Sequence, residues 1–389
     1  MARSAEALVE APLLRWARET AGLTREEAAR SLQTTDKKVL AWEGGDERPS
    51  MPQLRKMAAV YKRQLSDFYL PTPPEEGALP HDFRRLPGDG VFHYGRAIRF
   101  QLRQARIRRE LALDFAEEQD IPVAELPKVA KTVDAEGLGS EIRKLLKVSE
   151  AEQRSWRDPR KSYNAWRSRV EDAGVLVFQV TGVLPSEMLG FSLTERPLPI
   201  IGINRKLAPN GRTFTLLHEF VHVLLGESSL CDIEENFARP PQEQAMEVFC
   251  NAVAAATLVP RDALLADALV KTHTQPREWD DEELDSIARN FGVSKHVVLR
   301  RLLTFGRTTR TFYASRAVSW RVYEPTSVKE DADFKRNMPQ EVVSDLGRPL
   351  VKMIVESYLN ANLSLSDASR YLGLRAGQVA RVRELVFRS

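Results

Sequence analysis

The sequence has 389 residues, which is enough for two or three domains rather than one. Hydrophobic residues make up 43% and charged residues 29%, the balance of an ordinary globular protein. The formal net charge of +3 excludes a strong whole-chain preference for acidic or basic partners, so local clusters must carry any such preference. The two cysteines, Cys231 and Cys250, exclude a disulfide framework and predict a reducing compartment.

The first residues lack an apolar core followed by a small-residue cleavage site, so they do not predict a signal peptide. No apolar run approaches the roughly 18 residues that a membrane span requires. We therefore expect a cytoplasmic protein without a membrane partner. No internal repeat of fixed period and no low-complexity tract stands out in the sequence.

The first seventy residues predict a compact set of short helices. Thr24 begins one of them, and Glu27 follows three residues later, which is the pattern of a capping box. A short polar step leads to a second helix that ends at the glycine pair 44–45. In a helix-turn-helix, the first residues of the second helix contact base edges, and a residue of the preceding helix can meet a phosphate. The candidates for these contacts are Thr35, Asp36, Lys37, Lys38 and, for the phosphate, Arg25.

A plain helical bundle used for dimerisation is the alternative for this segment, because helix-turn-helix spacing by itself is a weak signal. The prolines and glycines of residues 71–90 then predict a linker. A basic helix is expected over about 94–119, and eight arginines fall between Arg84 and Arg109. This arginine cluster either extends a phosphate-binding surface or forms an ordinary solvated helix face.

From about residue 155 the pattern predicts a small domain that mixes strands and helices. Apolar, β-branched runs predict strands at 175–180, 189–193 and 199–204. Helical patterns follow over about 211–225, 241–257, 260–270, 280–290 and 294–305, with two more after Gly347. The stretch 310–340 fits no simple pattern.

The sharpest feature is the string His218-Glu219-Phe220-Val221-His222. Residues four apart lie on one face of a helix, so His218 and His222 can chelate one ion. Glu219 projects into the same cleft, where it can accept a proton from a water molecule that the metal activates. Zinc suits this set because it accepts nitrogen and oxygen ligands and leaves one position open.

The helix that carries this string is apolar nearly all round, so we expect it to be buried. Burying histidines and carboxylates costs free energy unless they are paired or bind a metal. The alternative to a metal site is that the five-residue string arose by chance and that its histidines are hydrogen-bonded core residues. The next helix offers a third ligand in Glu247, the one carboxylate between Gln244 and Pro260, and Asn251 could orient it one turn on. Glu243 is the rival ligand, nearer the polar start of that helix.

Two segments resemble known families. Residues 13–70 resemble the Xre/Cro-like helix-turn-helix domain, through the elements WEGG and PSMPQL. Residues 155–305 resemble the ImmA/IrrE family of HExxH metallopeptidases, through TFTLLHEFVHVLLG and EVFCNAVAAATLVP. Cys250 stands where that family usually has alanine, and Val253 where phenylalanine is common, but neither change removes a ligand.

The resemblance implies a zinc peptidase with His218, His222 and Glu247 as ligands of Zn2+ and Glu219 as the catalytic base. Relatives in this family cleave Xre-type repressors, which implies such a repressor as the protein substrate and an operator in double-stranded DNA as a second partner. The tail after Gly347 resembles the C-terminal extension of long family members. A homodimer is a further expectation.

The expected fold is α+β and predominantly α. Residues 1–70 are expected to form an all-α helix-turn-helix domain, and residues 71–154 a linker with a basic helical connector. A small zincin-like α+β peptidase domain, with a short mixed or antiparallel sheet and following helices, is expected over 155–305. Residues 306–389 are expected to form a helical C-terminal region.

Overall fold

A computed structural model of the chain describes residues 5–74, 81–82, 95–129, 134–231, 241–320 and 337–387. The chain divides into two compact units. The first unit contains residues 1–79 and 89–106, and the second contains residues 80–88 and 107–389. The four-part division expected from the sequence stays a prediction. Among the described helices, none is both long and apolar enough to cross a membrane.

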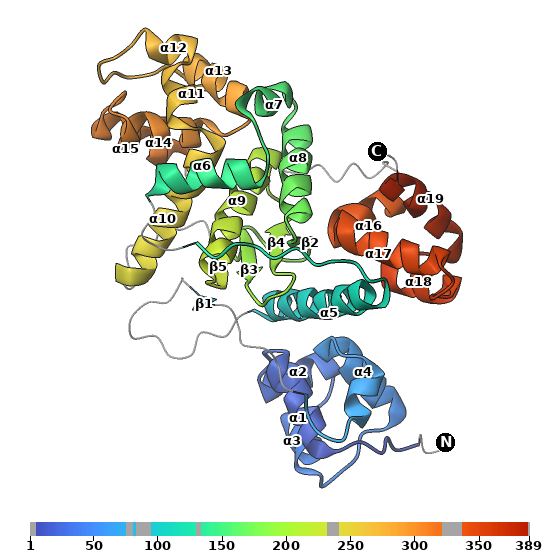
Figure 1. Ribbon diagram of the computed structural model, residues 1–389. Helices are drawn as coiled ribbons and strands as arrows, with labels where there is room; N and C mark the ends of the chain where they lie inside the picture. The colour runs from blue at the N-terminus through green and yellow to red at the C-terminus, as the bar shows by residue number, and fades with distance from the viewer. Residues whose placement is uncertain are drawn as a thin grey trace. The chain divides into compact units, whose positions relative to one another are not determined.

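The first unit is built from short helices around one apolar core (Figure 1). Trp42, Tyr61 and Phe68 are among its fully buried side chains. The prediction of a set of short helices is confirmed here. The elements are α1 (Ala11–Thr20), α2 (Arg25–Leu32), α3 (Asp36–Gly44), α4 (Met51–Tyr61) and the 3-10 helix η1 (Leu65–Tyr69).

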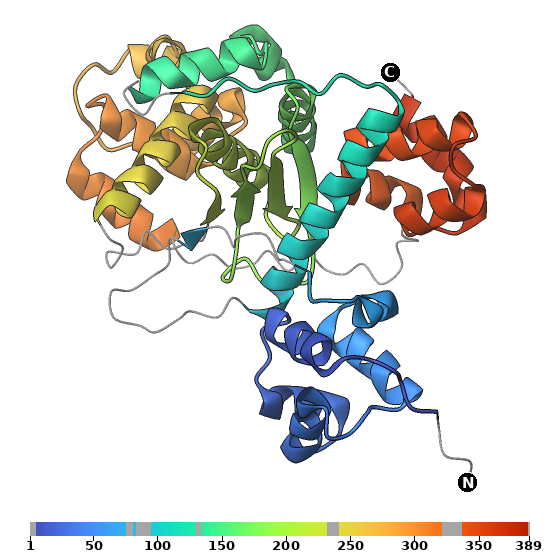
Figure 2. The ribbon, with the colours of Figure 1, turned by 60° about the horizontal axis from the view of Figure 1, so that its bottom comes forward.

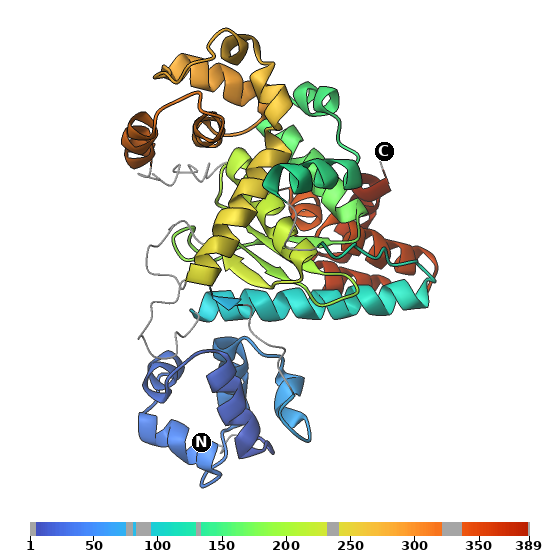
Figure 3. The same cartoon turned by 60° about the vertical axis from the view of Figure 1, so that its left-hand side comes forward.

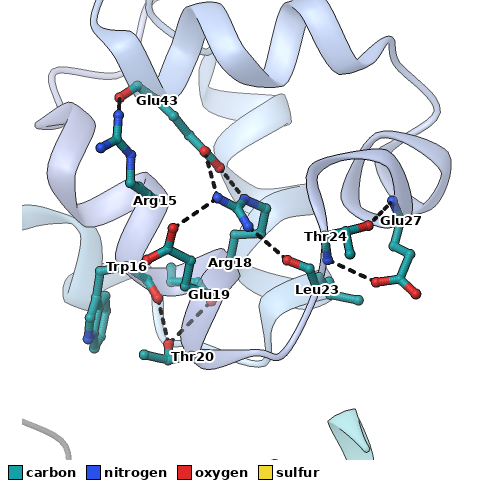
Figure 4. A network of polar contacts seen from close by, with 10 residues as sticks. Arg15, Trp16, Arg18, Glu19, Thr20, Leu23, Thr24, Glu27 and Glu43 are labelled. Carbon is teal, nitrogen blue, oxygen red and sulfur yellow. Dashed lines mark hydrogen bonds and ion pairs between the residues drawn. The ribbon is translucent and has the colours of Figure 1, made fainter. Parts of the chain in front are cut away.

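Local sequence fixes the ends of these helices. The Thr24 hydroxyl accepts a hydrogen bond from the Glu27 amide, and the Glu27 carboxylate accepts one from the Thr24 amide, so the predicted capping box at α2 is confirmed. The predicted glycine stop of α3 is also confirmed, since Gly45 has a φ of 82° that favours glycine. Inside the unit, Arg18 and Glu43 form a buried, two-pronged ion pair that ties α1 to α3 (Figure 4).

The second unit contains a mixed sheet with the strand order β1-β5-β3-β4-β2. β2 runs parallel to β4, and β3 runs antiparallel to both β4 and β5, as the strands side by side in Figure 2 show. The three strands that the sequence predicts are confirmed, whereas the two short strands at one side of the sheet, β1 and β5, were not predicted. The strands are β1 (His81–Asp82), β2 (Leu176–Val180), β3 (Gly190–Leu193), β4 (Ile200–Asn204) and β5 (Ser229–Cys231).

Both faces of the sheet are covered, because every residue of β2, β3 and β4 is buried. Val177 and Ile201 belong to the same apolar core as Trp166 of α8 (Pro159–Asp172). Phe178 points to the opposite face, as strand alternation requires, and lies against the Arg108 guanidinium. The sheet therefore provides a rigid platform for the long helix α9 (Pro209–Leu225), which crosses it.

The remaining helices pack around this platform, and α10 passes beside α9 (Figure 3). The helices expected over about 241–257, 280–290 and 294–305 are confirmed. The helix expected over 260–270 is two helices, because Asp267 caps a new start there. They are α6 (Ala135–Leu145), α7 (Glu150–Ser155), α10 (Pro241–Leu258), α11 (Arg261–Leu265), α12 (Ala268–Lys271), α13 (Asp281–Phe291), α14 (Lys295–Thr304) and α15 (Arg310–Trp320).

Three helices, not the expected two, follow Gly347 in the C-terminal group. This group attaches to the sheet through α16, since Gln179 of β2 donates a hydrogen bond of 2.8 Å to Ser344. The α+β and predominantly α fold class is confirmed. The helices of the group are α16 (Met338–Leu346), α17 (Arg348–Leu359), α18 (Leu365–Leu372) and α19 (Ala376–Phe387).

Candidate metal centre

Helix α9 presents its two histidines from a fully buried position. Pro209 starts the helix and Gly226 ends it in the left-handed conformation, so 17 residues form one uninterrupted helix. Leu217 and Phe220 fix the helix in the core. His218 and His222 lie one turn apart with exposures of 1% and 0%, and both rings point to the side where α10 packs.

The third predicted ligand comes from α10. The Nε2 atoms of His218 and His222 are 3.2 Å apart. Glu247 completes the group, since its oxygens lie 3.3 Å from His218 Nε2 and 3.1 Å from His222 Nε2. A tetrahedral zinc with bonds of about 2.0–2.1 Å holds its ligand atoms about 3.3–3.5 Å apart. The two imidazole nitrogens lie at nearly this spacing, and the Glu247 carboxylate reaches each of them with one oxygen, so this donor set fits a metal ion.

Glu219 lies beside these three residues and is also fully buried. Its Oε2 accepts a hydrogen bond of 2.6 Å from the Ser229 hydroxyl of β5, which in turn lies 2.9 Å from Ser192 of β3. Its Oε1 has no hydrogen-bond partner among the described residues. One oxygen is therefore held in place while the other can accept a proton.

The charges of the four residues are coupled. Burial raises the pKa of Glu219, and the neighbouring histidines and Ser229 lower it in part, leaving a net rise. Burial also opposes the charge of Glu247, but contact with both imidazoles holds the pKa of this carboxyl well below its usual range. Burial lowers the pKa of His222, but Cys250 and Glu247 raise it by more than burial lowers it, so the pKa rises to about 9. Glu247 is thus kept as the carboxylate that a cation requires.

Sequence reasoning missed two residues of this site. Ser229 could not be found, because nothing in the sequence places β5 beside α9. Cys250 is buried and raises the pKa of His222, so it belongs to the surroundings of this ligand. Its position three residues after Glu247 on the same helix was the available signal.

A glycine lets the sheet approach the site closely. A Cβ atom on Gly190 of β3 would lie 2.6 Å from Thr215 and 3.4 Å from the Glu219 side chain. Only glycine lets β3 pass this close to α9. Asn251, expected to orient Glu247, makes no hydrogen bond to the metal-site residues within the described segments, and the rival ligand Glu243 has its side chain outside them.

The predicted DNA contacts lie on α2 and α3 of the first unit. Arg25 is the first residue of α2, and Thr35 caps α3 by accepting a hydrogen bond from the Lys38 amide. Asp36 follows in the first turn, and Lys37 is exposed. Lys38 forms an ion pair with Glu47. Arg25 therefore begins α2, whereas the other four residues lie together at the start of α3.

The arginine cluster of α5 (Arg96–Glu118) has a different role in each unit. In the first unit, Arg103 donates a hydrogen bond of 2.6 Å to the Lys62 carbonyl. In the second unit, Arg109 donates to the carbonyls of Pro197 and Leu198, at 2.7 Å and 3.0 Å. Arg103 and Arg109 therefore bind backbone carbonyls of the chain itself, and a phosphate-binding surface on this helix stays a prediction. Arg84 lies outside the described residues.

The comparisons with known proteins agree with this geometry. Residues 11–67 match the family model of a helix-turn-helix domain, and residues 170–303 match that of an IrrE N-terminal-like domain, of the M78 peptidases. A stretch of 74 residues is 36% identical to the radiation response metalloprotease IrrE of Deinococcus deserti. That stretch is 18% of this chain and 26% of the relative, so the match spans about a quarter of the relative's length. No solved structure matches the chain.

The chain therefore combines an N-terminal helix-turn-helix domain with an IrrE-like domain of the peptidase type. The two matches together indicate the domain types, a helix-turn-helix and a metallopeptidase-type domain. Its buried group of two histidines and a glutamate could hold a metal ion.

Proposed function

We propose that the protein is a zinc metallo-endopeptidase directed by its DNA-binding domain, and that it cleaves an Xre-type repressor or a similar regulatory protein. The observation that carries this proposal is the triangle of donor atoms from His218, His222 and Glu247, with the Glu219 carboxylate beside it. A metal bound there would polarise the scissile carbonyl and lower the pKa of a water molecule.

Glu219 is the proton carrier of the proposed reaction. Its Oε1 would accept a proton from the attacking water and deliver it to the leaving amine, while Ser229 holds Oε2. Burial of the carboxylate excludes bulk water from this transfer. The carbonyl adds the water oxygen, the peptide C–N bond breaks, and the amine leaves with the proton, so no further reactant is required.

Glu219→Gln tests the proposed base. Glutamine keeps the size of the side chain but cannot take up the proton, so cleavage should fall on the order of 10²–10⁴-fold. The measurement compares new protein N-termini in cells that express the wild type or the variant, followed by cleavage of the identified substrate with purified protein. The zinc content and DNA affinity of the variant should be unchanged. Undiminished cleavage would show that Glu219 is not the base.

The complete helix-turn-helix match over residues 11–67 favours a second candidate function. In this function the protein is a transcriptional regulator or an antitoxin-like protein, and the peptidase fold is a sensor or a scaffold. Regulation should then be normal in the Glu219→Gln protein. Changing Lys37 and Lys38 to glutamate should weaken operator binding and its dependence on salt. The absence of any DNA affinity at low salt would contradict this function.

A further inference from the structure

The C-terminal helices α18 and α19 form a corner whose first helix and turn have the same lengths as those of α2 and α3. α18 and α2 each have 8 residues. A residue in the left-handed conformation follows each, Gln33 with a φ of 56° and Gly373 with a φ of 64°. The second helix then begins after an equal number of residues, at Asp36 in one corner and Ala376 in the other. Both ends of the first helix, the left-handed residue and the start of the second helix are thus displaced by the same number of residues, although α19 is longer than α3.

The backbone of the turn is also the same in both corners. The Thr34 amide donates to the Ala29 carbonyl at 2.9 Å, and the Leu374 amide donates to the Ser369 carbonyl at 2.9 Å. The first helix is capped alike, since Ser364 accepts from the Asp367 amide at 3.1 Å as Thr24 accepts from Glu27 at 3.2 Å. The resemblance therefore extends from helix lengths to individual hydrogen bonds.

The two corners bury equivalent positions. Two buried positions of the first helix and two of the second coincide in register, and a preceding helix packs against the second helix, α1 in one corner and α17 in the other. The buried residues are Ala28, Leu32, Val39 and Trp42 in the first corner and Ala368, Leu372, Val379 and Val382 in the second. A three-helix core of this kind is what holds the second helix of a helix-turn-helix at the correct angle for the major groove.

The second helix of the C-terminal corner has an open and basic surface. Arg375, Gly377 and Arg381 are exposed around its first turns. Within the described segments, no ion pair involves Arg375 or Arg381. A Cβ atom on Gly377 would meet nothing within 4 Å, so a duplex could approach the backbone closely at this point. A free basic helix start is the surface that phosphates and base edges require.

The helices α13 and α14 form a similar corner around Gly292, but its surface differs. The first turn of α13 is acidic, and Lys295 at the start of α14 lies 3.5 Å from Asp281. The next residue, His296, stacks on Tyr313 of α15. An acidic, covered helix start would repel a phosphate backbone. The shape of the corner is therefore not sufficient, and the surface of α19 distinguishes the C-terminal corner.

We propose that α18 and α19 are a second helix-turn-helix that binds double-stranded DNA, with the first turns of α19 in the major groove. Arg375 and Arg381 would contact phosphates or guanine edges, and Gly377 would allow close approach of the backbone. This role goes beyond the proposed function, which uses only the N-terminal domain for DNA. With this role, the protein has two DNA-binding surfaces.

The test uses the full-length chain and a fluorescein-labelled 30-base-pair duplex of random sequence at low salt, followed by anisotropy. Lys37→Glu and Lys38→Glu together weaken DNA binding by the N-terminal domain, and the affinity for the duplex that remains is assigned to α19. Adding Arg381→Glu should weaken that remaining binding roughly tenfold or more and reduce its salt dependence. Gly377→Glu should weaken the remaining binding in the same way. An added Cβ at this position meets no atom within 4 Å, so this variant separates lost DNA binding from a folding defect caused by Arg381→Glu.

Lys352→Glu is the matched control, because it makes the same change of charge on an exposed side chain of α17. It should weaken the remaining binding much less than Arg381→Glu. Equal effects of these two variants would overturn the proposal, since only net charge would then matter. Complete loss of duplex binding in the protein with Lys37 and Lys38 changed would also overturn it. Circular dichroism and zinc content should be the same in all variants.

Discussion

The two oxygens of the Glu219 carboxylate have different surroundings. Oε2 receives the Ser229 hydroxyl at 2.6 Å, whereas Oε1 has no partner in the described part of the chain. A carboxylate with one donor cannot rotate freely, so its second oxygen keeps a fixed direction. Ser229 is thus a positioning residue for the proposed base, and it acts from a strand of the sheet.

Ser229→Ala should therefore lower the rate of substrate cleavage by about tenfold, because hydrogen bonds to charged groups contribute about 1.5–3 kcal/mol. Zinc content should not change, since Ser229 is not part of the donor triangle. The measurement is kcat together with metal analysis. Ser192→Ala is the control, because Ser192 contacts Ser229 but reaches Glu219 only through it, and a smaller loss is expected. An equal loss in both variants would contradict a specific role for Ser229.

At the scale of elements, α1 and α3 are joined by the buried pair Arg18–Glu43. Arg18 Nε lies 2.6 Å from one Glu43 oxygen and Nη2 lies 2.9 Å from the other. Arg18 also donates to the Leu23 carbonyl at the end of the turn before α2 (Figure 4). One guanidinium therefore connects the three helices that place the DNA-contacting residues.

Glu43→Ala should destabilise these helices by up to about 3–5 kcal/mol, because the buried Arg18 guanidinium would keep only the exposed Glu19 as an ion-pair partner. Hydrogen exchange of the full-length chain should show lost protection in α1 and α3. Replacing both residues together, Arg18→Met with Glu43→Leu, should recover much of the protection, since no buried charge then remains. The idea is wrong if the double replacement is as destabilised as Glu43→Ala.

The sequence predicted elements wherever local signals were strong. The capping box at Thr24, the glycine stop at Gly45 and the histidine spacing in α9 are contained in a few adjacent residues, and their geometry was foreseeable. The strands β1 and β5 could not be predicted in this way, because β1 has two residues and pairs only with residues distant in sequence. The similarity of the α18–α19 corner to the α2–α3 corner was missed in the sequence. The two corners share few identical side chains and lie far apart in the chain, so they do not form a periodic repeat.

At the scale of the whole molecule, a bound metal would connect α9 to α10 inside the second unit. Chelation should therefore reduce hydrogen-exchange protection in these two helices and leave α1 to α4 unchanged. A ligand at 1,000 times its dissociation constant contributes about 4.1 kcal/mol to the folded state, so the effect should be readily measurable. Glu247→Gln should reproduce the effect of chelation without a chelator. Equal loss of protection in both units would contradict a local role of the metal.

The order of segments along the chain has a consequence for any attempt to shorten it. The strand β1 belongs to the second unit, yet it precedes residues 89–106, which belong to the first. A fragment that starts at residue 107 would therefore lack β1 and leave β5 paired on one side only, with β3. The unpaired backbone of β5 would become an open sheet edge, a template for pairing with another chain. That edge carries Ser229, so a fragment cut to isolate the peptidase would be prone to self-association beside its proposed catalytic base.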